Sequence, residues 1–323
     1  MRFAIVGAGA TGGFLGAHLA RAGEDVTLVA RGAHLAAMRE RGLTVRASGG
    51  EFTAFPQCTD ELEAVRSADV VFVTLKAHQL VQVAPRLGSL LKPEATLLGA
   101  QNGIPWWYLH REGGRLEGTV LDSVDPGGGI TASIPLDQVV GCIAYPATQL
   151  EGPGIVRHLE GTRFTIGEPD GTRSERCQVI SSALIRAGLK CPITARIRQE
   201  LWLKLLGNAT LNPVSALTGA TLARMASAPE SRELIGGLMA EVEAVASGLG
   251  IEIQMSIEKR LDGAWAVGEH KTSMLQDVEA GKPIEIDALV GSVVELGRLL
   301  EVPTPGLEVV YRLGRLLNAR LQA

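Results

Sequence analysis

The clearest chemical pattern in this sequence is a line of polar residues within RQELWLKLLGNATLNP, residues 198–213. Lys204, Asn208 and Asn212 are spaced i, i+4 and i+8, so they share one face of a helix. A lysine with two amides suits the binding of a ketone oxygen and a carboxylate. The same line also fits a solvated face, although asparagine and glycine are poor residues for an exposed helix. Pro213 predicts that the helix ends or kinks at Asn212.

A second polar group lies in KTSMLQD, residues 271–277, and in PIEID, residues 283–287. Ser273 and Gln276 fit a capping box that begins a short helix, which accounts for Ser273 without a chemical role. Glu285 and Asp287 likewise fit the acidic start of the next helix, over residues 288–300. The pattern alone therefore predicts local helix caps at these positions.

The elements that would position a cofactor begin at the amino terminus. An apolar run at residues 3–6 predicts a buried strand, Gly7, Gly9 and Gly12 fill G-x-G-x-x-G, and a helix over 10–22 and a strand over 26–29 follow. The glycines allow a tight turn, a close approach of the pyrophosphate and a helix packed near the strand. This strand–turn–helix–strand order predicts a dinucleotide site.

The end of the second strand indicates which dinucleotide is bound. An NAD site usually carries an acid here to bind the ribose 2′-hydroxyl, whereas this chain has Arg31. A guanidinium suits a 2′-phosphate because it offers two charge-assisted hydrogen bonds. The alternative is a solvated arginine at a strand end. We predict NADP rather than NAD.

Three further residues follow strands at the carboxyl edge, where open α/β sheets bind ligands. Lys76 comes after the apolar run 69–75, with Gln79 one turn later, and Asn102 begins an Asn-Gly pair after the strand 95–99. A lysine there is often only solvated, and Asn-Gly often marks only a turn. The aromatic run 106–108 could line an apolar substrate pocket or fill a seam between domains, and the sequence does not separate these.

The remaining pattern predicts two domains of an α/β protein. Short strands between residues 139 and 192 indicate an antiparallel or mixed extension of the sheet, whereas helices dominate beyond residue 195. We therefore expect an N-terminal Rossmann-type dinucleotide-binding domain at 1–193 and an all-helical C-terminal domain at 194–323.

Composition excludes several other classes of protein. The chain has a net charge of −4 and no basic block, so nucleic acid is not an expected partner. No stretch has the pattern of a membrane span. The four cysteines show no metal-ligand spacing with histidine, so we expect no metal, and reduced thiols point to the cytoplasm. The apolar C-terminal helices permit a homodimer.

Along nearly its whole length the chain resembles the ketopantoate reductase family. The shared motifs are GAGATGG at the start, Arg31, Leu75-Lys76, Asn102-Gly103, W-x-K-x-x-x-N-x-x-x-N-P at 202–213, and SMLQD followed by EID. The late motifs are the more discriminating, because glycine-rich turns are common.

The resemblance implies a role for each of these residues. Lys204 would be the general acid that protonates the ketone oxygen, and Glu285 its acidic partner, which positions the substrate hydroxyl. The implied substrate-binding residues are Asn102, Asn208, Asn212 and Ser273. The implied cofactor-binding residues are Gly7, Gly9, Gly12, Arg31, Lys76, Gln79 and Asn102.

The function expected from the resemblance is reduction of 2-dehydropantoate to pantoate with NADPH. Gln101 and the run IPWWY at 104–108 are bulkier than the family pattern, which leaves the 2-keto acid substrate open. Two alternatives remain: a reductase of another 2-keto acid or an imine, and an NADP(H)-binding sensor without catalysis. A sensor has no need of a proton donor, which argues against it.

Overall fold

The structure is a computed structural model and describes residues 1–322. The chain forms two compact units. The first unit contains residues 1–101, 107–119 and 127–197, and the second contains 102–106, 120–126 and the chain from Arg198 onward. The sequence predicts one boundary after residue 193, but two short insertions in the first unit thus belong to the second.

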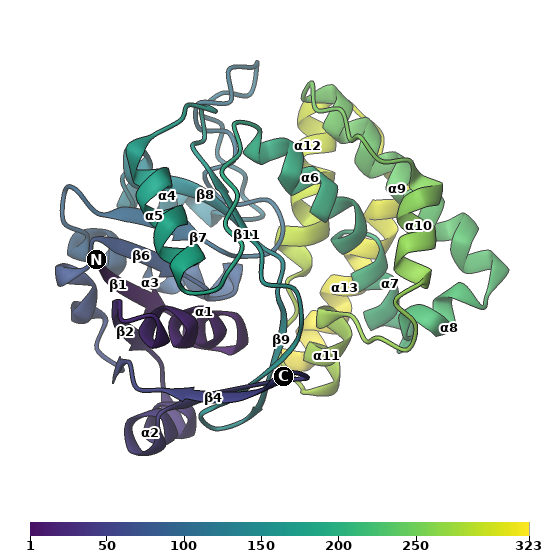
Figure 1. The fold of residues 1–323 in the computed structure, drawn as a ribbon. Coiled ribbons are helices and arrows are strands. Elements are labelled where there is room, and N and C mark those ends of the chain that lie inside the picture. Colours follow the sequence, from purple (N-terminus) through teal and green to yellow (C-terminus); the bar gives the residue numbers. More distant parts are fainter. Residues whose placement is uncertain (323) are drawn as a thin grey trace. The chain divides into compact units, whose positions relative to one another are not determined.

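A seven-stranded sheet forms the centre of the first unit, in the order β11-β8-β7-β6-β1-β2-β5 (Figure 1). All neighbouring pairs are parallel except β8 and β11. The inner strands β6, β7 and β8 are buried on both faces, which explains their continuous apolar runs. Their bounds are β1 Arg2–Val6, β2 Asp25–Val29, β5 Gln57–Thr59, β6 Val70–Val73, β7 Thr96–Gly99, β8 Val139–Ala144 and β11 Phe164–Gly167.

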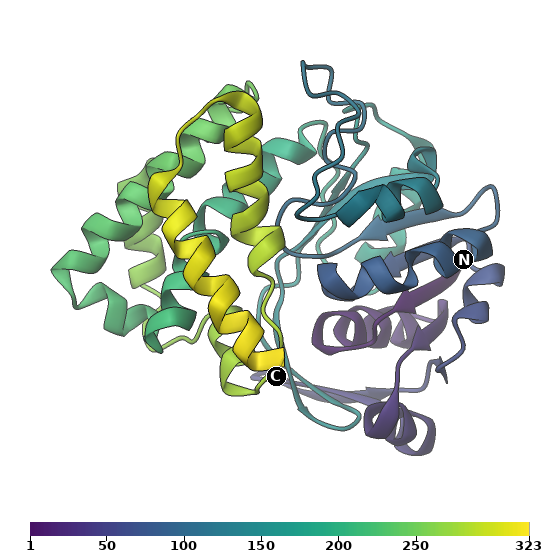
Figure 2. The ribbon, with the colours of Figure 1, turned by 180° about the vertical axis from the view of Figure 1, so that it is seen from behind.

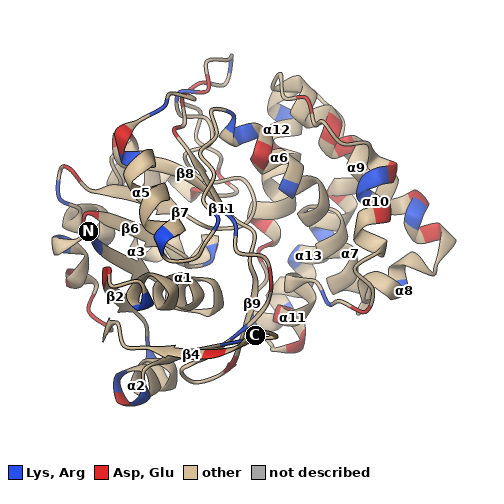
Figure 3. Cartoon of the chain, in the orientation of Figure 1, with Lys and Arg blue, Asp and Glu red and all other residues tan. Residues whose placement is uncertain are grey.

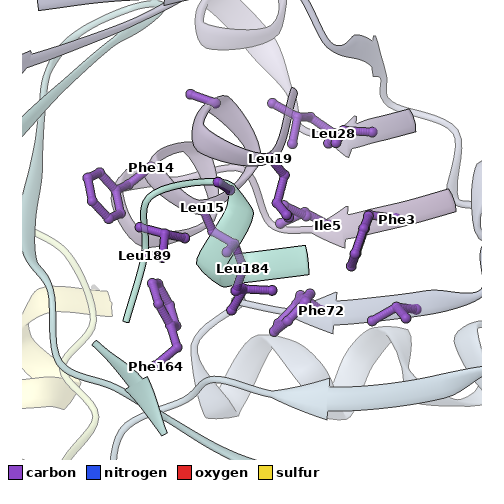
Figure 4. Close-up of a cluster of buried hydrophobic side chains, with 14 of the residues drawn as sticks. Phe3, Ile5, Phe14, Leu15, Leu19, Leu28, Phe72, Phe164, Leu184 and Leu189 are labelled. Carbon is purple, nitrogen blue, oxygen red and sulfur yellow. The ribbon is translucent and has the colours of Figure 1, made fainter. Parts of the chain in front are cut away.

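Helices cover both faces of this sheet. They are α1 Ala10–Arg21, α2 Gly32–Arg41, α3 Ala77–Leu90, α4 Gly129–Ser133 and α5 Glu175–Arg186. Helices α1 and α5 share one core with the strands, in which Leu15 and Leu184 lie near Phe72 and Phe164 (Figure 4). Helices α3 and α4 pack together on the opposite face (Figure 2). The parallel sheet with helices on both faces confirms the predicted Rossmann-type fold.

A second sheet of four strands lies on the outer side of α1. Its order is β4-β3-β10-β9, with bounds β3 Leu43–Ala47, β4 Gly50–Ala54, β9 Ala147–Gly152 and β10 Ile155–Glu160. A Cβ at Gly13 of α1 would lie 3.1 Å from Val156 and 3.5 Å from Leu43, and the Phe14 ring stacks on His158 at 4.6 Å. The prediction that these strands extend the main sheet is therefore wrong, except for β8 and β11.

The second unit contains only helices among the elements that the structure describes. They are α6 Ile197–Asn208, whose first residue belongs to the first unit, α7 Leu211–Thr218, α8 Leu222–Ala226, α9 Pro229–Gly248, α10 Ile257–Trp265, α11 Ser273–Glu279, a π-helical turn Asp287–Gly291, α12 Ser292–Leu300 and α13 Pro305–Gln322. Figure 2 shows α12 and α13 at the yellow end of the colour scale. The all-helical C-terminal region is confirmed.

The helix predicted over 198–213 is interrupted earlier than expected. Helix α6 ends at Asn208 and α7 begins at Leu211, with Thr210 in between. A continuous helix would place the Pro213 ring against the carbonyl of Ala209, four residues back, and would lose one hydrogen bond. In the observed arrangement Pro213 lies in the first turn of α7, where no N–H is needed. Asn212 therefore does not continue the α6 face that carries Lys204 and Asn208.

Charged residues of both signs are interspersed along the chain (Figure 3). On α2, for example, Glu40 lies between Arg39 and Arg41. This mixture agrees with the net charge of −4. Among the described helices, none is both long and apolar enough to cross a bilayer.

Candidate active site

The glycine-rich turn links β1 to α1 in the first unit. Gly7 has a φ of +102°, which disfavours any residue with a Cβ, and its N–H donates to the Val29 carbonyl at 3.1 Å. At Gly12 a Cβ would lie 2.3 Å from Thr74 Oγ1 and 2.5 Å from the Gly7 carbonyl oxygen. The fold itself therefore requires these two glycines.

Gly9 differs, because the protein leaves the space beside it open. A Cβ there would find only the Gly7 carbonyl oxygen, at 4.0 Å. Gly9 is also the N-cap of α1 and has no side chain to satisfy the first-turn N–H groups. A helix N-terminus that no side chain caps, with open space beside Gly9, fits an anion such as the pyrophosphate of a dinucleotide.

Arg31 and Lys76 follow the two strands that flank β1. Since β2 and β6 both pair with β1 in parallel, the two residues lie at the same carboxyl edge as the glycine turn. Arg31 is exposed and is the N-cap of α2, and Lys76 is the N-cap of α3. The Gln79 side chain stabilises the start of α3, because its Oε1 accepts a hydrogen bond from the Lys76 N–H at 3.1 Å.

In the second unit, Lys204 and Asn102 are brought together across 102 positions of sequence. The Lys204 ammonium Nζ donates a hydrogen bond to Asn102 Oδ1 at 2.8 Å, and both residues are half-buried. The family resemblance implies that Asn102 binds both the cofactor and the substrate. Asn102 lies in the second unit with Lys204.

Gly103, which follows Asn102, helps to fix the backbone that carries the Asn102 side chain. Gly103 has a φ of +88°, and a Cβ there would lie 2.1 Å from the Ala288 carbonyl oxygen. The Ile104 N–H donates to the same oxygen at 3.0 Å. The Asn-Gly pair is thus more than a turn: it docks the segment 102–106 onto the π-helical turn.

The other predicted substrate residues gather around α7 and α11. Asn212 is only 7% exposed, and its Nδ2 lies 3.5 Å from the Ser273 Oγ, at the outer limit of a hydrogen bond. The predicted capping box at Ser273 is wrong, because Thr272 is the N-cap and its Oγ1 accepts from the Leu275 N–H at 3.3 Å. Ser273 is instead the first residue of α11 and is exposed.

The acidic residues before α12 have different roles. Asp287 Oδ1 accepts a hydrogen bond from the Tyr311 hydroxyl at 2.7 Å, and burial together with this bond raises the pKa of Tyr311 to about 12. Asp287 thus anchors α13 to the π-helical turn. Glu285 is half-buried between buried Ile284 and Ile286, and its carbonyl accepts from the Leu289 N–H at 3.1 Å. π-helical turns are often found at functional sites.

Comparison with known proteins agrees with this arrangement. The family model for ketopantoate reductase PanE/ApbA matches residues 3–171, and the model for its C-terminal domain matches residues 196–318. The chain belongs to the ketopantoate reductase family. It is therefore an oxidoreductase, and its cofactor is a nicotinamide dinucleotide.

Individual relatives match over nearly their whole length. A 2-dehydropantoate 2-reductase of Mesorhizobium japonicum is 46% identical over 318 residues, 98% of each chain. A solved structure from Ralstonia solanacearum, described as a candidate ketopantoate reductase, is 41% identical with a TM-score of 0.93 over 99% of this chain and 98% of that one. The 2-dehydropantoate 2-reductase of Methylococcus capsulatus is 27% identical with a TM-score of 0.80, over 100% and 98%.

The aromatic run of this ketopantoate reductase is buried. Trp106 is 7% exposed and belongs to the second unit, whereas Trp107 at 2% and Tyr108 at 1% belong to the first. The Trp107 ring packs on Gly141 of β8, where a Cβ would lie 2.8 Å from its Cη2. Glycine at position 141 therefore makes room for the indole, and Trp107 is part of the core of the first unit.

His34 is a structural residue of the first unit that sequence analysis did not find. His34 lies on α2, and its Nδ1 accepts a hydrogen bond from the Gly154 N–H at 3.0 Å, joining α2 to the β9–β10 turn. Burial lowers the pKa of His34, and the nearby Ala8 backbone offsets part of the shift. Only the neutral ring can accept this bond, and no local sequence pattern marks such a contact.

This shift predicts that the first unit loses stability in acid. Because the pKa of His34 is lower in the folded chain, the unfolded chain takes up the proton first as the pH falls through 6.5. The free energy of unfolding should therefore decrease from about pH 7.5 to about pH 5.5. His34→Gln keeps an acceptor but does not titrate, so denaturant unfolding should show a smaller slope with pH. Half-buried His18, whose pKa is also lowered by burial, contributes to the slope that remains. Equal slopes for the two proteins would contradict this role.

Proposed function

We propose that this protein reduces 2-dehydropantoate to pantoate with NADPH. The proposal is supported by family membership, the open anion site at Gly9, the exposed Arg31 at the end of β2, and the pairing of Lys204 with Asn102. Among these observations the Lys204–Asn102 hydrogen bond carries the proposal, because it places an ammonium proton donor beside a second polar group.

The residues of the second unit would complete the reaction in one proton transfer. The nicotinamide, when bound, supplies the hydride that the carbonyl carbon accepts. Lys204 donates a proton from Nζ to the carbonyl oxygen, so the product is a neutral hydroxyl and the lysine is left as an amine. Before transfer, the ammonium stabilises the charge that develops on this oxygen. Asn102 Oδ1 accepts one ammonium hydrogen and thereby orients the others.

The remaining polar residues would bind and orient the substrate. Asn208 lies one turn from Lys204 at the end of α6, and Asn212 with Ser273 forms a second polar pair. Glu285 would accept a hydrogen bond from the substrate hydroxyl. These roles follow from the motif and from the location of the residues in the second unit.

A substrate panel tests this function directly. Oxidation of NADPH would be followed with 2-dehydropantoate, with 2-keto acids of smaller and larger side chain, and with imines formed from a keto acid and an amine. We expect 2-dehydropantoate to give the highest kcat/KM. A higher value for an imine, or no turnover with any keto acid, would contradict the proposal.

We also propose that Arg31 selects NADPH over NADH. Loss of a charge-assisted bond to the 2′-phosphate costs about 1.5–3 kcal/mol, roughly 10- to 150-fold in affinity. Arg31→Ala should therefore weaken NADPH binding by that factor and leave NADH nearly unchanged, as measured by fluorescence titration. Exposed Arg41, at the other end of α2, provides the control substitution Arg41→Ala. Equal weakening of both cofactors, or a wild-type preference for NADH, would show that the assignment is wrong.

The same proposal includes the location and the oligomeric state of the protein. None of the described cysteines forms a disulfide, and three of them are buried, which suits a reducing cytoplasm. Val309, Leu313 and Leu316 form an exposed apolar line on α13, at 59%, 49% and 71% exposure. This line favours a homodimer.

A further inference from the structure

One arginine of the second unit is packed directly against the helix that carries Lys204. Arg260 lies on α10, and its guanidinium rests on α6 at Gly207. A Cβ at Gly207 would lie 2.1 Å from Arg260 Nη2, 2.9 Å from Cζ and 3.0 Å from Nε. No other residue than glycine leaves room for the guanidinium in this position.

The location of Gly207 places the guanidinium beside the polar residues of the site. Gly207 follows Lys204 by three residues, so the two are neighbours on one side of α6, and Asn208 comes directly after Gly207. Glycine is also among the poorest helix formers, and Gly207 is buried within α6. The helix thus contains an unfavourable residue at the one place where the guanidinium needs room.

The proposed substrate needs a cationic group other than the proton donor. A 2-keto acid carries a carboxylate next to its ketone, whereas Asn102, Asn208, Asn212 and Ser273 are all neutral. A guanidinium offers parallel N–H donors in a planar fork that matches the two oxygens of a carboxylate. We propose that Arg260 binds the substrate carboxylate and so sets the specificity of the enzyme for 2-keto acids. This inference rests on the proposed function.

The first experiment compares an acid with its neutral analogue. Wild-type enzyme and Arg260→Gln would be assayed with 2-dehydropantoate and with the corresponding 2-keto amide. We expect Arg260→Gln to raise KM for the acid by about 10- to 100-fold, with kcat changed much less, and to leave KM for the amide nearly unchanged. Added guanidinium chloride should partly restore activity on the acid in Arg260→Ala. Arg232→Gln, which removes an exposed arginine paired with Asp262, is the matched control.

The second experiment tests the packing at Gly207. Gly207→Ala should stabilise an isolated helix, yet the added methyl group displaces the guanidinium, so KM for the acid should rise. In an Arg260→Ala background the same change should have little further effect, because the two sites are then no longer coupled.

The outcomes separate this inference from the function on which it rests. If the wild-type protein reduces no 2-keto acid, the proposed function fails. If it does, but Arg260→Gln affects acid and amide alike, or Gly207→Ala acts equally in both backgrounds, then Arg260 is structural and this inference is wrong.

Discussion

Replacement of Lys204 by alanine is expected to lower kcat by about 10²- to 10⁴-fold while NADPH still binds. The reason is chemical: without the ammonium, no group at this position can protonate the carbonyl oxygen as the hydride arrives. Steady-state kinetics, together with a separate titration of NADPH binding, would distinguish a loss of chemistry from a loss of cofactor.

A methionine at the same position separates charge from bulk. Lys204→Met retains much of the aliphatic stem that packs in the half-buried site, but it cannot donate to Asn102 Oδ1 or to a substrate. It should be about as inactive as Lys204→Ala. Near-normal turnover in either variant would defeat the catalytic role and favour a sensor that binds NADP(H) without reducing a substrate.

The second large effect concerns stability rather than chemistry. Trp107→Ala should lower the free energy of unfolding by about 3–5 kcal/mol, since it leaves a cavity over Gly141 in a core where the indole is 2% exposed. Trp107→Phe, which keeps an aromatic ring, should cost less. Denaturant unfolding measures both changes.

The same variants test the alternative that Trp107 lines a substrate pocket. If Trp107 only packs, the ratio of kcat/KM between a small and a large 2-keto acid should be the same in folded wild-type and variant protein. A changed ratio would mean that the indole contacts substrate. Trp106, which belongs to the second unit, is a separate case and requires its own variant.

The main sheet could be predicted from sequence because its signals are local. Strands such as β6 and β8 are short apolar runs, and the glycine turn fixes where β1 ends. The second sheet could not, because β10 pairs with β3 through contacts such as Ile155 with Thr44, which are far apart in the chain. Strand β9 is hard to predict for a further reason: its residues are half-buried or exposed, so its apolar pattern is weak.

The site shows the same division between local and distant signals. The spacing of Lys204 and Asn208 predicted that both lie on one helix, as they do on α6, but it did not predict that the helix would break before Asn212, ahead of Pro213. Thr272 and Ser273 are adjacent hydroxyl residues, and sequence cannot decide which of them caps α11. His34 contacts Gly154, 120 positions away, and Arg260 contacts Gly207, 53 positions away. The only local signal for either contact is the glycine within α6, a residue that is unfavourable in a helix.

The second sheet also has a consequence for how the chain folds during its synthesis. Helix α1 is complete at Arg21, but the strands that cover its outer side include β9 and β10, which end at Glu160. The part of the outer face of α1 that Val156 and His158 cover, at Gly13 and Phe14, therefore stays exposed until about half of the protein has left the ribosome, although β3 and β4 can cover the rest earlier. At roughly 5–20 residues per second this delay lasts about 7–28 s. A fragment ending after β7 would be expected to expose the same apolar surface permanently and to aggregate.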